Sequence, residues 1–110
     1  MEQEDYMTNP SDAKVGDKLY VAGEVKPYTV KARDERYIIA TKPCNIHHTV
    51  QYFIIDLEIG WRGPDNMIFG GGYETQEAIA ERLWQLQNGE IEVSWRRSVK
   101  TAMVERVMSI

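Results

Sequence analysis

The chain has 110 residues, of which 43% are hydrophobic and 27% charged, and its formal net charge is -4. This length suits one domain, and the hydrophobic fraction excludes wholesale disorder. Four acidic residues and no Lys or Arg fall within residues 1–12, so the rest of the chain carries 13 charges of each sign. A neutral body disfavours binding to phosphate backbones, although basic residues can still cluster locally.

The composition also indicates where the protein works. Cys44 is the single cysteine, which excludes an intramolecular disulfide and favours a reducing compartment. The first ten residues, MEQEDYMTNP, lack the apolar core of a signal peptide. Wholly apolar runs such as Tyr37–Ala40 are four residues long, far below the ~20 residues of a membrane span. We therefore expect a cytoplasmic protein without a membrane partner.

Taken in chain order, residues 1–13 predict a flexible acidic leader, and residues 14–110 predict a single domain. Turn-forming residues close the leader at Asn9–Asp12. Leu19 and Val21 alternate with polar neighbours between two glycine turns, which predicts a short strand.

A hairpin follows. The alternation of apolar and polar residues over 28–33 resumes over 37–41, beyond a charged turn at Arg33–Arg36. Lys42–His48 predicts a loop, because a proline cannot donate to a strand ladder.

The stretch Thr49–Asn66 should hold the central strand. Its apolar residues recur at every second position from Phe53 to Ile59, and Asp56 and Glu58 lie between them on the expected solvent face. Gly60 should end the strand, and the proline and small polar residues of Arg62–Asn66 predict a turn with Trp61 at its tip.

The last part of the chain predicts one helix. Met67–Phe69 suits a short returning strand, and three glycines then break the pattern. The helix should span Thr75–Asn88, since Thr75 suits the N-cap and Gly89 the position past the C-terminus. Its apolar stripe comprises Ile79, Leu83 and Leu86, widened by Trp84. Two further strands are expected, one through Ile91, Val93 and Trp95 and one near Val104.

These elements define an α+β fold class: a small antiparallel, strongly bent sheet or SH3-like barrel of five to six strands with one late α-helix.

Two clusters suggest ligand chemistry, and each has a plainer interpretation. Cys44, His47 and His48 offer zinc-type ligands in a loop, but three ligands fall short of a structural site, and a polar loop is the favoured interpretation. Gly70–Gly72 before a helix resembles a phosphate-binding loop. The rest of that motif is missing, which favours a simple bend.

Two other clusters suggest contact surfaces. Tryptophan and arginine are common in interface hot spots, which makes the turn a candidate protein-binding site through Trp61, Arg62, Asp65 and Tyr73. The alternative is that Trp61 folds back and caps the core. A basic patch suits nucleic acid through Trp95, Arg96, Arg97 and Lys100. Ion pairing with Glu90 and Glu92 is the favoured interpretation of that patch.

No catalytic motif is found. Asp56 and Glu58 could act as paired carboxylates, but the solvent face of a strand explains them more simply. The sequence has no nucleophile elbow and no H-E-x-x-H. We therefore predict a non-enzymatic protein without a cofactor.

Four segments carry a family resemblance. These are VGDKLYV (Val15–Val21), YTVKARDERYIIATKP (Tyr28–Pro43), RGPDNMIFG (Arg62–Gly70) and YET (Tyr73–Thr75). In them the chain resembles a family of small uncharacterised bacteriophage and prophage proteins. The resemblance runs from about Val15 to Val107 and implies a virus-encoded accessory protein in the host bacterial cytoplasm. It implies no activity and no functional residues.

Two functions are therefore expected. The first is an accessory protein that binds, and could inhibit, a bacterial or viral protein. The alternative is a small-barrel nucleic-acid-binding protein.

Overall fold

The computed structural model describes residues 6–7, 9–44, 49–65 and 75–105. Within them, eight strands form one antiparallel sheet in the order β1-β8-β2-β3-β4-β5-β6-β7. The strands are β1 (Tyr6–Met7), β2 (Lys18–Tyr20), β3 (Tyr28–Arg33), β4 (Tyr37–Cys44), β5 (Thr49–Asp56), β6 (Trp61–Pro64), β7 (Arg97–Ser98) and β8 (Met103–Glu105). A 3-10 helix, η1 (Pro10–Asp12), and one α-helix, α1 (Gln76–Gln87), complete the fold.

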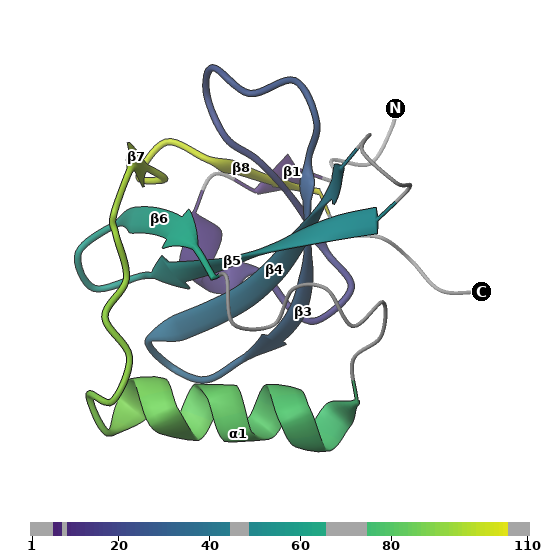
Figure 1. Cartoon of the computed structure of the whole chain (residues 1–110). Helices are drawn as coiled ribbons and strands as arrows, with labels where there is room; N and C mark the ends of the chain where they lie inside the picture. Colours follow the sequence, from purple (N-terminus) through teal and green to yellow (C-terminus); the bar gives the residue numbers. More distant parts are fainter. Residues whose placement is uncertain (1–5, 8, 45–48, 66–74, 106–110) are drawn as a thin grey trace.

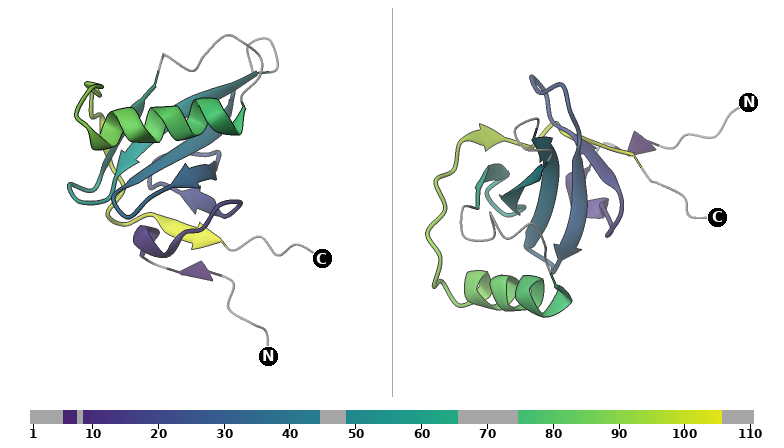
Figure 2. Two further views of the ribbon diagram at one scale, coloured as in Figure 1. Left: turned by 90° about the horizontal axis from the view of Figure 1, so that it is seen from below. Right: turned by 45° about the vertical axis from the view of Figure 1, so that its right-hand side comes forward.

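The sheet curls into a half-barrel, and α1 runs across its outer face (Figures 1 and 2). This confirms the predicted α+β class with a bent antiparallel sheet and one late helix, although the strands outnumber the five to six expected. Two of the additional strands, β1 and β7, have only two residues each and lie at the sheet edges. Elements this short carry no measurable periodicity in a sequence.

The core lies on both faces of the sheet. One apolar cluster fills the curl, with Leu19, Tyr28, Val30, Phe53 and Ile55 among its buried members. A second cluster lies between the sheet and α1 and contains Ile39, Tyr52, Ile54, Ile79 and Leu86. Adjacent residues of β4 and β5 are therefore buried on opposite faces, as expected for central strands covered on both sides.

The central strand is shorter than predicted. β5 ends at Asp56, residues 57–60 form a turn, and the predicted turn at Arg62–Pro64 belongs to β6 instead. Gly60 has a φ of 75°, a left-handed backbone conformation that glycine adopts easily, so the chain reverses direction between β5 and β6 at this residue. Pro64 is the last residue of β6 and lies past the part of β6 that pairs with β7, where a missing N–H removes no ladder bond.

Asp56 was expected on the solvent face of its strand, but its exposed fraction is only 2%. It lies on the same face as Ile54, which α1 covers, and both of its oxygens accept hydrogen bonds from Arg36, at 3.0 and 2.8 Å. The prediction was wrong because it assumed one buried face, whereas this sheet has two.

One other boundary differs from prediction. β4 continues through Pro43 to Cys44, which the sequence placed in a loop. The pairing with β3 stops at Thr41, so Pro43 lies beyond the part of β4 that needs donors on that side. Of the segment 1–13, predicted as a flexible leader, the structure describes residues 6–7 and 9–13, which include β1 and η1, and Pro10 and Ala13 are buried.

The helix is confirmed. Thr75 Oγ1 accepts the N–H of Ala78 at 3.0 Å, and Gly89 has a φ of 70° past the C-cap Asn88. Ile79 and Leu86 are buried and Leu83 packs beside them, but Trp84 is 50% exposed and does not widen the stripe. The expected strand through Ile91, Val93 and Trp95 is not a ladder strand, although all three side chains pack against the second cluster.

Candidate functional site

A buried carboxylate gathers three cations at one end of the sheet. Glu24 lies in the loop between β2 and β3, and its side chain is 5% exposed. Its Oε1 accepts from Lys42 Nζ at 2.6 Å and from the Tyr28 hydroxyl at 2.5 Å, and its Oε2 accepts from Arg62 Nη2 at 2.6 Å. Arg97 Nε lies 3.2 Å from Oε2. We call these five residues the Glu24 cluster.

Three strands supply the cations of this cluster. Lys42 comes from β4, Arg62 from β6 and Arg97 from β7, where Arg62 and Arg97 face each other across the ladder. Lys42 and Arg62 also lie 4.9–5.9 Å from the ring centroids of Tyr28 and Phe53. Cation–π attraction therefore offsets part of the cost of holding these charges at the margin of an apolar core.

The cluster controls the titration of its carboxyl group. Burial raises the pKa of Glu24, but hydrogen bonds from Lys42, Tyr28 and Arg62 and the charge of Arg62 outweigh burial and lower that pKa to about 2. Burial and the bond to Glu24 raise the pKa of Tyr28 above its ordinary value. The carboxylate is therefore charged and the phenol neutral at physiological pH.

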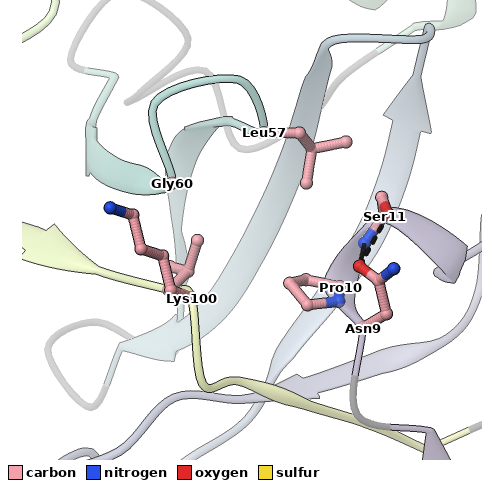
Figure 3. Close-up of a pocket in the computed structure, with 7 residues that line it drawn as sticks. Asn9, Pro10, Ser11, Leu57, Gly60 and Lys100 are labelled. Carbon is pink, nitrogen blue, oxygen red and sulfur yellow. Dashed lines mark hydrogen bonds between the residues drawn. The ribbon is translucent and has the colours of Figure 1, made fainter.

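A small pocket lies beside the turn between β5 and β6, with a volume of about 170 Å³. We call it the turn pocket. Its lining comprises Asn9, Pro10, Ser11, Leu57, Gly60, Val99 and Lys100, and Leu57, Pro10 and Lys100 approach it from three sides (Figure 3). Asn9 Oδ1 accepts from the N–H and hydroxyl of Ser11, which leaves its amide group as a donor. The volume is below the ~300–1,000 Å³ of small-molecule sites.

The residues of the predicted protein-binding turn have different surroundings. Trp61 begins β6 and is 38% exposed. Arg62 belongs to the Glu24 cluster. Asp65 is buried and accepts two hydrogen bonds from Arg82 of α1, at 3.0 and 2.7 Å, so it fixes the helix to the end of β6. Tyr73 lies outside the described residues.

The predicted nucleic-acid patch is likewise divided. Trp95 packs against the second core cluster, and Arg97 contacts Glu24. Arg96 and Lys100 are exposed and, among the described residues, form no ion pair. Trp61 lies directly opposite Ser98 in the β6–β7 ladder. The exposed parts of both predicted sites therefore meet at this sheet edge.

The residues of the other predicted ligand sites lie outside the described part of the structure. The side chains of Cys44, His47 and His48 and the whole of Gly70–Gly72 are not among the described parts. Within the ranges that are described, no three His, Cys, Asp or Glu residues are grouped to hold a metal ion.

Sequence reasoning did not find the Glu24 cluster. Its members are up to 73 residues apart, in segments read separately as a loop, a turn and a basic patch, and only the strand order brings them together. No periodicity marks a single acidic residue in a loop, so the sequence held no signal for this site.

Comparisons with known proteins add no relative. The chain matches no protein-family model, and searches of curated proteins and of solved structures give no match. Across the described ranges, none of the helical structure has the length and hydropathy to span a bilayer.

Proposed function

We propose that this protein is a non-enzymatic accessory protein, encoded by a bacteriophage or prophage, that binds a bacterial or viral protein in the host cytoplasm. The proposed contact surface comprises Trp61, the adjacent Ile59 and the turn pocket. We call it the Trp61 surface. An SH3-like barrel is the proposed finer fold class, and the short antiparallel strands that curl around the first apolar cluster support it.

The observation that carries the proposal is an exposed indole and an exposed isoleucine on either side of a glycine that lines the turn pocket. Ile59 and Trp61 are both exposed and flank Gly60, which lines the pocket. Tryptophan is enriched in interface hot spots, where it supplies a large contact area at a small entropic cost.

The pocket indicates the chemistry of that partner. Pro10, Leu57 and Val99 supply apolar groups to its lining, and Lys100 carries a positive charge that no described carboxylate pairs with. We therefore expect an acidic segment of a protein, with one apolar side chain in the pocket and a carboxylate next to Lys100.

A matched pair of tryptophan variants tests this proposal. Immobilised Trp61→Ala/Lys100→Gln should lose a partner that the unchanged chain captures from bacterial lysate. Trp84→Ala should retain it, because Trp84 is also exposed but lies on α1. Hydrogen exchange of the purified complex should show protection over residues 57–61. Retention of the partner by the double variant, with no protection there, would contradict the proposed surface.

Nucleic-acid binding is the second candidate function. The observation in its favour is that Trp61, Arg96 and Lys100 meet at the β6–β7 edge, where a base could stack on the indole beside two cations. Gel shifts on single- and double-stranded DNA and RNA at low salt test it, with Arg96→Gln/Lys100→Gln as the weakened variant. Phosphate contacts are strongest at low salt, so no shift under that condition would remove this candidate.

A further inference from the structure

We propose that the Glu24 cluster is a binding site for a phosphate group, held by Arg97, Lys42 and Arg62. The cluster lies on the face of β6 and β7 opposite Trp61, because paired residues share a face and successive residues alternate. It also shares no residue with the lining of the turn pocket, so the proposal does not depend on the function proposed above.

The charges of the Glu24 cluster do not balance. Three cations surround one carboxylate, and no other carboxylate among the described residues pairs with any of them. Like charges held this close repel, and partial burial weakens the screening that water would provide. Two positive charges are left over, which matches the charge of a phosphate dianion better than that of a single carboxylate.

The cations of the cluster keep hydrogen-bond donors that have no described partner. Arg62 uses Nε and Nη2 on Glu24, and Arg97 uses Nε on Glu24 and Nη1 on the carbonyl oxygen of Ala22, at 3.3 Å. Each guanidinium therefore keeps one terminal nitrogen without a described partner, and the Lys42 ammonium has donors left as well. Arginine forks and lysine ammonium groups are the usual donors to phosphate oxygens.

Arg97 is both accessible to solvent and held in place. Arg97 is 44% exposed, so an anion can reach it from solvent. Its guanidinium also lies against Gly23, where a Cβ would come within 2.7 Å of Nη1. Gly23 has a φ of 86°, which lets the loop approach this closely. Arg97 is thus held in place before a ligand arrives, which lowers the entropic cost of binding.

Titration of the ¹⁵N-labelled protein with sodium phosphate, compared with sodium chloride at the same ionic strength, tests the proposal. Phosphate should give saturable shifts at the amides of residues 22–26 and 96–98 and at the arginine Nε–H signals. Arg97→Gln should weaken phosphate binding about tenfold, as expected for the loss of one charge-assisted contact. Arg97→Lys should bind phosphate with intermediate affinity, because it keeps the charge but not the fork of donors. This partial recovery would show that the loss in Arg97→Gln does not come from misfolding.

Lys14→Gln is the matched control. It also removes one positive charge, but from an exposed side chain outside the cluster and outside both surfaces proposed above, so phosphate affinity should be unchanged. Equal shifts with chloride, or wild-type affinity in Arg97→Gln, would show that the cluster is an ion network of structural importance only and would overturn the proposal.

The same assay distinguishes the sources of the phosphate. A short single-stranded oligonucleotide without terminal phosphates should shift the same signals at lower concentration if the site takes a nucleic-acid backbone. Shifts with inorganic phosphate but not with the oligonucleotide would indicate a free phosphate or phosphomonoester. Both results support the site and differ only in the ligand that carries the phosphate.

Discussion

At the scale of single residues, Glu24 decides whether three cations can stay together. Without its charge, Lys42, Arg62 and Arg97 would repel one another at the margin of the core, with only the rings of Tyr28 and Phe53 to offset the repulsion. Its lowered pKa means that the folded state binds this proton more weakly than the unfolded state does, so the cluster stabilises the fold.

The lowered pKa of Glu24 predicts the direction in which stability changes with pH. The stabilisation by Glu24 should be complete above its unfolded pKa of 4.5 and should be lost as the pH falls toward about 2. Glu24→Gln should lower the free energy of unfolding at pH 7 by about 2–4 kcal/mol, because it leaves the cations unpaired. It should also flatten the loss of stability between pH 4.5 and 2.5. Urea unfolding across this range measures both effects.

Glu35→Gln is the control for that experiment. Glu35 is exposed and has no hydrogen bond or ion pair among the described residues. Its replacement should change stability by less than about 0.5 kcal/mol and keep the wild-type pH profile. If Glu24→Gln instead gave a profile parallel to that of the wild type, the cluster would not be the source of the acid sensitivity.

At the scale of elements, α1 shows how a helix is fixed to a sheet with two buried faces. Ile79 and Leu86 point into the second cluster, while the buried Asp65 at the end of β6 binds Arg82. Gln87 also donates to Asp34 in the turn between β3 and β4, at 2.6 Å. The apolar stripe that holds the helix is thus narrower than its sequence predicted. Polar contacts through Arg82 and Gln87 hold it at two further points.

The orientation of α1 can be checked with two truncations. Leu86→Ala should lower the free energy of unfolding by about 2–4 kcal/mol, because it leaves a cavity under the helix. Trp84→Ala removes a larger side chain but should change stability by less than about 1 kcal/mol, because that side chain is half exposed. Thermal unfolding of both variants measures this. A greater loss in Trp84→Ala would mean that the helix presents a different face.

The elements that sequence predicted are those whose signals are local. The caps at Thr75 and Gly89 and the alternation around the β3–β4 turn depend only on neighbouring residues, and the structure confirms them. The strand limits at Asp56 and Pro43 depend on which strands pair with β5 and β4. An alternating pattern of apolar and polar residues carries no information about those partners. The Glu24 cluster depends on the order of strands that are distant in the chain, so no local pattern could reveal it.

At the scale of the whole molecule, strands from both ends of the described chain pair with each other. β8 lies between β1 and β2, and β8 is the one described strand that β1 pairs with. Buried Pro10 and Ala13 continue this contact, and Arg33 Nη1 donates to the carbonyl oxygens of Ser11 and Ala13, at 2.8 and 2.5 Å. Residues 6–7 and 9–13 therefore contribute to the stability of the domain.

Deletion of residues 1–13 tests this contribution through a double-mutant cycle. The deletion should lower the free energy of unfolding by about 2 kcal/mol, since it exposes apolar surface of the first core cluster and removes the acceptors of Arg33. Arg33→Gln should cost about 1–2 kcal/mol in the full chain and much less after the deletion, which gives a coupling energy near 1 kcal/mol. Glu35→Gln should have the same small effect in both chains. Additive costs for the deletion and Arg33→Gln would show that the segment 1–13 acts independently of Arg33.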